Sequence, residues 1–278
     1  MPAPQASVMQ TLAKAKFMSF NTKLPTDWKQ PQGEAGKQYV RAFKTTELVG
    51  MPPVPPMFLP ATLNKYHTDT AKKIGDDFSK YIDGICSAIC SAWSQWQTIA
   101  SMTGVMVNAV TATVGQVLGP PWYPLIMASA PKSTPSEAKY SNAIAMAISN
   151  GWLSYQATIK VPGLPWYPAF AAFPGPIAPP MPNIPCPVIA LTQVTASVKA
   201  NALSGSMTGS LADPTALHHK QLFDSISDAF EKCFLIWQTS TMVTNVLGTG
   251  PIPTFAPPFV PVGPVVGGVG NMPPGGFV

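Results

Sequence analysis

Residues 81–98 read YIDGICSAICSAWSQWQT, and this stretch decides the predicted fold. Its large apolar side chains Ile85, Ile89, Trp93 and Trp96 follow the spacing i, i+4, i+8 and i+11. Residues at this spacing share one face of an α-helix. The stretch therefore predicts a helix whose aromatic face must be buried against another part of the protein.

The same pattern occurs twice more, in residues 140–158 (YSNAIAMAISNGWLSYQAT) and 222–239 (LFDSISDAFEKCFLIWQT). When the three stretches are aligned without gaps, Trp96, Tyr155 and Trp237 coincide, and a glutamine follows each of them. A second aromatic set aligns one turn earlier: Trp93, Trp152 and Phe234. A pattern that recurs within one chain is typical of a structural repeat. We expect three superposable helices whose aromatic faces meet in a common core.

A proline-rich element follows each expected helix. Gly119–Pro124 and Gly163–Pro168 both contain Pro-Trp-Tyr-Pro, and Gly250–Phe255 is a looser version of the same element. Proline fixes φ and removes a backbone donor, so these elements are expected to be extended or turning. The prediction is a mainly α fold of three repeated helical cassettes, each followed by an extended Pro/Gly-rich segment. Three such units fit a pseudo-threefold arrangement.

This pattern divides the chain into four expected segments. Residues 1–70 form an N-terminal arm with a polyproline linker at Met51–Pro56, and residues 71–131, 132–212 and 213–278 hold the three units with their tails. The arm is expected to start with a short helix, with Val8, Met9, Leu12 and Phe17 facing inward. This short helix is expected over Gln5–Phe17, and further helical features are expected at Asp69–Thr98, Ile189–Leu203 and, as a helix start, Asp213-Pro214.

Charged residues are few and unevenly placed. They make up 10% of the chain, against about 25% in ordinary soluble domains. Residues 84–131, 161–198 and 233–278 contain none. Low charge together with 46% hydrophobic residues argues against disorder and against an isolated monomer. We expect the neutral tails to be assembly surfaces that lie in grooves on neighbouring subunits, with Pro251–Val278 needed for assembly but not for folding.

The sequence contains no recognisable catalytic motif. It has no Gly-x-Ser-x-Gly, no Walker loop and no dinucleotide-binding glycine pattern followed by a helix, so we predict no enzyme activity, no cofactor and no small-molecule substrate. Cys86 and Cys90 could join a histidine in a metal site, but they share their helix face with Ile89 and Trp93, which favours buried free thiols. The acidic residues Asp76 and Asp77 are expected at a helix start, where acids favour the helix dipole.

Nucleic acids and membranes are less favoured partners. The net charge of +5 comes without dense basic clusters, which argues against nucleic acid. Ile99–Leu118 has the length of a bilayer span, but it contains six polar side chains and two glycines. Lys14 and Lys16 interrupt the first 20 residues, so we expect no signal peptide, synthesis in the cytoplasm and reduced cysteines.

The candidate site residues are the aromatic side chains of the helices and proline-rich segments. No catalytic, cofactor-binding or metal-binding residue is predicted. The residues expected to build the core and the interfaces are Trp93, Trp96, Trp122, Tyr123, Trp152, Tyr155, Trp166, Tyr167, Phe234, Trp237, Phe255 and Phe259.

The chain resembles structural proteins of phage virions and contractile injection systems, such as baseplate, spike and tube-associated components. The resemblance depends on the helix endings Trp96-Gln97-Thr98 and Trp237-Gln238-Thr239 and on the neutral segments Gly119–Pro124 and Pro251–Val278. It covers about residues 78–278 and points to no specific family. It implies a non-catalytic structural subunit of a virion or injection particle, with other structural proteins as partners. A membrane-associated or membrane-active protein and an enzyme with an unrecognised site remain alternatives.

Overall fold

The computed structural model describes residues 3–20, 65–213, 216, 218–255 and 262–278. The chain forms two compact units: Met1–Phe17 with Ile82–Val278, and Met18–Tyr81. We call the first of them unit 1, and it contains the candidate site and the sheet that are analysed below.

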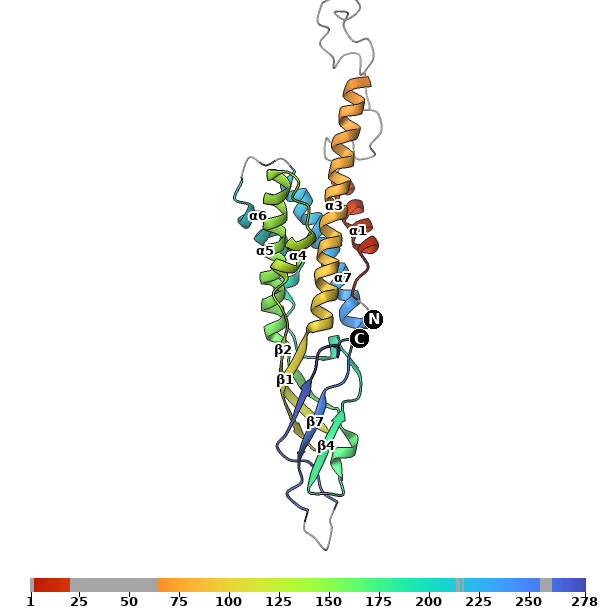
Figure 1. Ribbon diagram of the computed structural model, residues 1–278, viewed down its shortest axis with the longest axis vertical. Coiled ribbons are helices and arrows are strands. Elements are labelled where there is room, and N and C mark those ends of the chain that lie inside the picture. The colour runs from red at the N-terminus through yellow and green to blue at the C-terminus, as the bar shows by residue number, and fades with distance from the viewer. Residues whose placement is uncertain (1–2, 21–64, 214–215, 217, 256–261) are drawn as a thin grey trace, which may run out of the picture. The chain divides into compact units, whose positions relative to one another are not determined.

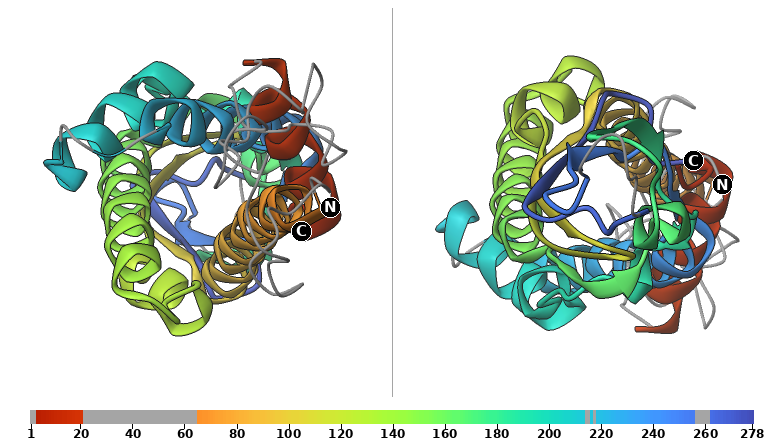
Figure 2. Two further views of the ribbon diagram at one scale, coloured as in Figure 1. Left: turned by 90° about the horizontal axis from the view of Figure 1, so that it is seen from above. Right: turned by 90° about the horizontal axis from the view of Figure 1, so that it is seen from below.

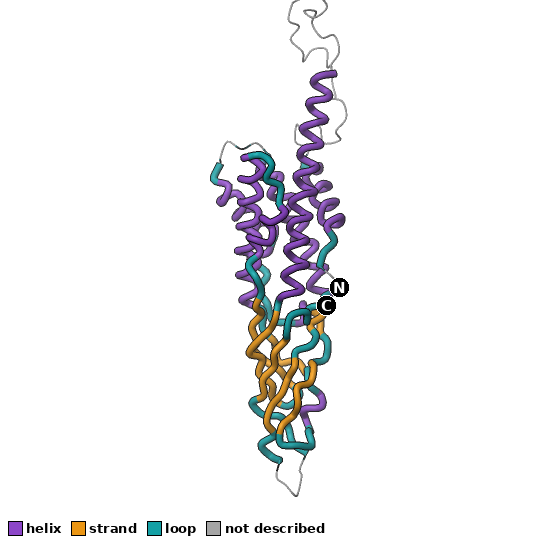
Figure 3. Tube along the Cα trace, in the orientation of Figure 1, coloured by secondary structure: helices purple, strands orange, loops and turns teal. Residues whose placement is uncertain are grey.

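Unit 1 has a helical region and a sheet region at opposite ends (Figures 1 and 3). The helices of the described chain are α1 (Ala6–Ser19), α3 (Lys65–Ile99), α4 (Trp122–Ser129), α5 (Pro135–Thr158), α6 (Ala200–Leu211) and α7 (His219–Ser240). A capping box starts α5: the Thr134 hydroxyl accepts the Glu137 N–H at 3.1 Å, and the Glu137 carboxylate accepts the Thr134 N–H at 3.0 Å. Pro135, in the first helical position, fixes φ near its helical value.

The sheet region is antiparallel throughout. Its strands are β1 (Ser101–Asn108), β2 (Thr111–Leu118), β3 (Val161–Pro165), β4 (Ile177–Pro182), β5 (Cys186–Pro187), β6 (Met242–Val243), β7 (Leu247–Pro251) and β8 (Gly268–Met272). Six of them form one sheet in the order β3-β2-β1-β8-β7-β4, and β5 pairs with β6. The central pairing joins distant parts of the chain, because Met102 lies opposite Val117 on one side and Met272 on the other.

The prediction of a mainly α fold with repeated cassettes is therefore wrong. Within the described residues the chain has an α/β fold, with six α-helices and a six-stranded antiparallel sheet. The neutral segments expected to be extended tails supply the strands, which pair with one another and bury one face as a sheet. The two Pro-Trp-Tyr-Pro elements also differ: Trp122 starts α4, whereas Pro165 ends β3 and Pro168 starts a 3₁₀ turn over Pro168–Ala171.

The C-terminal segment Pro251–Val278 belongs to the fold of unit 1. Its strand β8 pairs with both β1 and β7 in the middle of the sheet. Phe277 is buried, with its ring centroid 5.6 Å from that of Trp96 and 6.4 Å from that of Trp237. These contacts argue against the expectation that this segment is dispensable for folding, because its removal would take away a central strand and part of the aromatic core.

Two expected helix starts are also corrected. The helix expected at Ile189–Leu203 begins later, as α6 at Ala200, because the Glu231 carboxylate of α7 accepts the Ala200 N–H at 2.7 Å and satisfies a donor of its first turn. The described helix that follows the expected start at Asp213-Pro214 is α7, which begins at His219, while Pro214 itself lies outside the described residues.

The longer helices agree better with the sequence. The helix expected at Asp69–Thr98 is confirmed as part of α3, but Asp76 and Asp77 lie inside it and not at its start. The helix expected at Gln5–Phe17 corresponds to α1, which buries Met9, Ala13 and Phe17 and leaves Val8 exposed. The expected polyproline linker Met51–Pro56 lies outside the described residues.

Candidate functional site

The helices α3, α5 and α7 lie around one centre (Figure 2), where ring contacts join aromatic side chains of all three helices. Trp152 of α5 is the middle of this cluster: its ring centroid lies 4.8 Å from Trp96 and 5.1 Å from Trp93, and it stacks on Trp122 of α4 at 4.2 Å. The prediction that the three aromatic faces meet in one core is confirmed by these contacts. The cluster members, all almost fully buried, are Trp93, Trp96, Trp122, Trp152, Tyr155, Phe234 and Trp237.

The glutamines that follow the aligned aromatic residues join the three helices. The Trp96 indole N–H donates to Gln156 Oε1 at 2.8 Å, and the Trp237 indole N–H donates to Gln97 Oε1 at 3.0 Å. Gln238 donates to the Tyr155 hydroxyl at 3.5 Å, and also to Gln193 Oε1 at 2.9 Å. Each helix is thus linked to the other two by buried polar contacts, which satisfy polar groups that would be costly to bury alone.

Gly119 packs directly against the aromatic cluster where the chain passes from the sheet to α4. A Cβ atom at Gly119 would lie 2.1 Å from Nε1 of Trp96, closer than any side chain can approach. The connection from β2 to α4 can therefore pass over the Trp96 indole only because residue 119 has no side chain. Burial also raises the pKa of the Tyr155 hydroxyl above its usual value, so this group stays protonated. The cluster is a packed core with no group poised for acid–base chemistry.

The remaining candidate residues are spread over both regions. Trp166 and Tyr167 are buried in the sheet region, where the Tyr167 ring stacks on Phe170 at 5.0 Å and its hydroxyl donates to the Val246 carbonyl at 2.9 Å. Tyr123 is 38% exposed and donates to Asn142 Oδ1 at 2.7 Å. Phe255 is half-buried, and Phe259 lies outside the described residues.

Within the described residues, no group of three His, Cys, Asp or Glu side chains could hold a metal ion. Cys86, Cys90 and Cys233 are buried and free, and for Cys86 and Cys90 this confirms the predicted burial. Burial raises the pKa of Cys90 to about 12 and that of Cys233 to about 11, so neither thiol is a nucleophile at neutral pH.

A small apolar cavity lies between the N-terminal segment and α7. It has a volume of about 210 Å³, below the roughly 300–1,000 Å³ of typical ligand pockets. Its lining contains no charged side chain and consists of Ala3, Pro4, Gln5, Val8, Cys233, Ile236 and Trp237. The cavity is smaller than a typical ligand pocket, and Gln5 is the one polar side chain in its lining.

The most distinctive surface is the outer face of the six-stranded sheet. Met106 and Val269, which lie opposite each other on β1 and β8, are 48% and 53% exposed. None of the six strands contains an Asp, Glu, Lys or Arg. We call this surface the neutral sheet face and define it by six exposed residues: Thr103, Met106, Gln116, Leu247, Val269 and Asn271.

Prolines occupy both edges of this sheet. The edge strand β3 contains Pro162 and Pro165, and the edge strand β4 contains Pro179, Pro180 and Pro182. Because proline has no backbone N–H to donate, neither edge is suited to pairing with a strand of another chain. Contact with another molecule is therefore better served by the face of the sheet than by its edges.

The sequence reasoning missed every residue of the neutral sheet face. A signal for it was present, because Val110-Thr-Ala-Thr-Val114 alternates apolar residues with threonine at a period of two. It follows Val105-Met-Val107 after the short connection Asn108-Ala109, and two β-rich runs separated by a turn residue are typical of a hairpin. The structure forms this hairpin as β1 and β2.

Neither a search for membrane spans nor a comparison with known proteins identifies a function for this chain. Among helices of the described residues, none is long and apolar enough to cross a membrane. A comparison with known proteins finds no matching family model, no matching curated protein and no matching solved structure.

Proposed function

We propose that this chain is a non-catalytic structural subunit of a larger particle, of the phage-virion or contractile-injection kind that its sequence resembles, and that the neutral sheet face packs against a neighbouring subunit. The observation that supports this proposal most directly is the separation of charge within unit 1. The strands of the sheet region carry no charge, while the helical region carries ion pairs such as Lys139–Asp213 and Lys199–Glu231.

The exposed apolar side chains of the neutral sheet face would favour its burial against another molecule. Met106, Val269 and Leu247 are 48%, 53% and 38% exposed. Burial of apolar surface contributes roughly 25 cal/mol per Å², and here it would desolvate no ion. Monomers rarely expose large contiguous apolar patches, and such patches usually mark interfaces.

The polar side chains on the same face favour protein over lipid as the partner. Thr103, Gln116 and Asn271 lie among the apolar residues of the neutral sheet face. Buried polar side chains require hydrogen-bond partners, which a protein surface supplies and lipid hydrocarbon does not. The expected partner surface is therefore an uncharged protein surface with its own donors and acceptors.

Two methionines allow a matched test. Met106 lies on the neutral sheet face and is 48% exposed, and Met146 lies on α5 in the helical region and is 41% exposed. We expect Met106→Lys to lower incorporation into the particle about tenfold or more, because a lysine there must be desolvated at the interface. Met146→Lys is expected to change incorporation less than twofold. Incorporation is measured as the share of tagged chain that sediments with high-mass particles from the source cells.

Folding and membrane binding are measured on the same variants. Both lysine variants should keep the circular dichroism spectrum and melting temperature of the original chain. The proposal fails if the original chain sediments as a free protein, or if the two variants lose incorporation equally. Flotation of the original chain with phosphatidylcholine vesicles, abolished by Met106→Lys alone, would favour the membrane alternative.

A further inference from the structure

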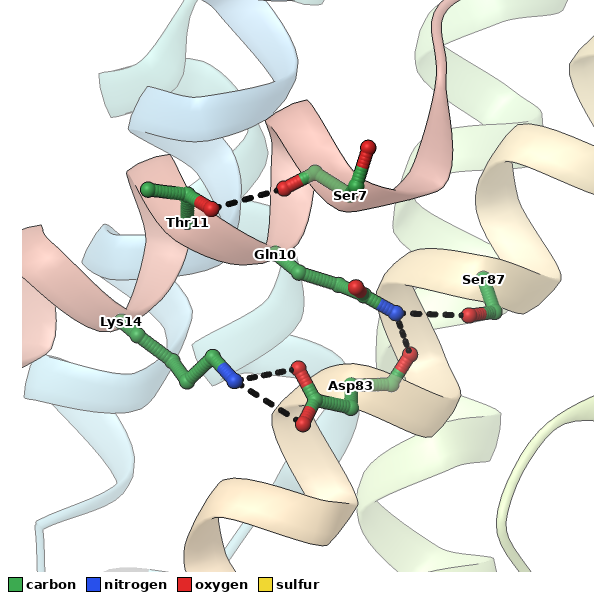
Figure 4. Close-up of polar contacts among 6 residues, drawn as sticks. All are labelled: Ser7, Gln10, Thr11, Lys14, Asp83 and Ser87. Carbon is green, nitrogen blue, oxygen red and sulfur yellow. Dashed lines mark hydrogen bonds and ion pairs between the residues drawn. The ribbon is translucent and has the colours of Figure 1, made fainter.

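The helix α1 packs through an apolar stripe. Beside this stripe, Gln10 and Lys14 make polar contacts with α3 (Figure 4). Met9, Ala13 and Phe17 are spaced four residues apart and are buried. Beside them, Gln10 Nε2 donates to the Asp83 carbonyl at 3.1 Å and to Ser87 Oγ at 2.9 Å. Lys14 Nζ lies 2.7 Å and 2.9 Å from the two carboxylate oxygens of Asp83.

The surface that receives α1 is suited to one particular helix. It is formed by α3 and α7, and we call it the α1 groove. Its floor includes Cys90, whose Sγ lies 3.8 Å from Met9 Sδ, and its wall on α3 carries Asp83 and Ser87. Cys233 and Trp237 of α7 lie beside the segment that leads into α1. A matching helix needs three small or apolar residues at i, i+4 and i+8, with an amide and a cation on the next stripe.

Chain connectivity does not tie α1 to the groove of its own copy. The chain leaves unit 1 after Phe17 and returns to it at Ile82, and the Lys14–Asp83 contact spans 69 positions. The 45 residues from 20 to 64 connect α1 to α3, and a chain of that length can span up to about 150 Å. An α1 from a neighbouring copy can therefore reach the same groove and make identical contacts.

We infer that the α1 groove also accepts α1 of a second copy of this chain, so that exchange of α1 links neighbouring subunits. Exchange of an identical element preserves every contact of the groove and so costs little in packing. The inference rests on the proposed function only in one respect: copies held side by side in a particle present α1 at a high local concentration. An unfilled groove would expose apolar residues to water, so the groove favours occupation by one α1 or another.

Isotope-coded cross-linking tests this inference on the purified chain. Equal amounts of ¹⁴N-labelled and ¹⁵N-labelled chain are mixed at high concentration, in one arm as folded protein and in a second arm by refolding together. A zero-length carbodiimide reagent then joins Lys14 to Asp83, whose atoms are 2.7 Å apart. With full exchange, half of the Lys14–Asp83 cross-linked peptides should combine the two isotopes. Asp83→Asn removes the cross-link and identifies the peptide.

A second ion pair in the same protein supplies the control. Lys139 and Asp213 are also 2.7 Å apart, are separated by 74 positions and join parts of the helical region on either side of α6. Their cross-link should combine only one isotope in both arms. Mixed-isotope Lys14–Asp83 peptides in either arm, with single-isotope Lys139–Asp213 peptides, support exchange. Single-isotope Lys14–Asp83 peptides in both arms overturn it, as do equal mixed fractions for the two pairs. This experiment does not measure incorporation into the particle. A negative result would therefore overturn α1 exchange without bearing on the proposed function, which the Met106→Lys variant tests.

Discussion

The tetrapeptide Pro-Trp-Tyr-Pro occurs once in the helical region and once in the sheet region, with a different structure in each. At residues 121–124 it starts α4, with Pro121 as an extended N-cap. At residues 165–168 it ends β3 and turns into a 3₁₀ segment. Both tryptophans are buried, but Tyr123 is 38% exposed while Tyr167 is 2% exposed.

The neighbouring residues explain the difference between the two copies. Pro124 is followed by Leu-Ile-Met-Ala, which can continue a helix, and Pro124 itself lies in the first turn, where proline is tolerated. Pro168 is followed within eight residues by Pro174 and Gly175, which stop regular structure. The comparison teaches that a buried tryptophan anchors the tetrapeptide in both places. The residues around the tetrapeptide determine its backbone conformation and whether its tyrosine is buried or exposed.

The largest expected effect tests whether both tryptophans are anchors. Trp122→Ala and Trp166→Ala should each lower the free energy of unfolding by about 3–5 kcal/mol, because each removes a fully buried indole and leaves a cavity. Chemical denaturation at neutral pH measures both losses. A loss below about 1 kcal/mol at either position would show that the two copies do not share an anchor.

Two cysteines allow the helical and sheet regions to be compared through the dependence of stability on alkaline pH. Burial raises the pKa of Cys90 in the helical region to about 12 and that of Cys186 in β5 to about 11, from 9.0. Between about pH 9 and 11 the unfolded thiols ionise while the native ones keep their protons. The native state thus binds more protons, and stability falls as pH rises, by about 1.4 kcal/mol per pH unit for the buried Cys90 and by less for the half-buried Cys186, which water screens.

Alanine variants separate the two thiols. Cys90→Ala should make the fall of stability with pH shallower up to about pH 12, and Cys186→Ala only up to about pH 11. The readout is the slope of unfolding free energy against pH, which a cavity at either site shifts little. A profile unchanged by Cys90→Ala would mean that this thiol ionises in the native state as readily as in the unfolded one.

The helical core was predictable from the sequence because its signal is local. The spacing that places Ile85, Ile89, Trp93 and Trp96 on one helix face lies within 12 residues, and the structure buries all four. The helices that pack against that face could also be identified from the sequence, because the same spacing of aromatic residues occurs in α5 and α7. The alignment even placed Gln97, Gln156 and Gln238 at the positions that join the helices.

The sheet and its candidate interface were not predictable in the same way. The pairing of Met102 with Met272 joins residues 170 positions apart, and no local pattern specifies it. The charge-free stretches indicated burial, but they could not tell burial within the sheet from burial against a partner. The register then exposes Met106 and buries Val105 and Val107, a distinction that a shift of one residue would reverse.

The smallest expected effect returns to the two tyrosines. Tyr167→Phe removes a buried hydrogen bond to the Val246 carbonyl and should cost about 1 kcal/mol. The cost stays modest because that carbonyl also accepts the Asn183 N–H at 3.1 Å and keeps a partner. Tyr123→Phe removes an exposed bond to Asn142, for which water substitutes, so it should change stability by less than about 0.5 kcal/mol.

Denaturation curves of the two phenylalanine variants, recorded side by side at pH 7, measure this difference. The substitution is the same in both copies of the tetrapeptide, so any difference between them comes from the region in which the tyrosine lies. Equal losses would mean that Tyr123 is as well packed as Tyr167, and a larger loss at Tyr123 would reverse the comparison. The larger expected loss at Tyr167 means that burial, and not the tetrapeptide sequence, determines how much the hydroxyl contributes to stability. Tyr167 is buried against Gly248 of β7, where a Cβ atom would be 2.6 Å from the tyrosine ring.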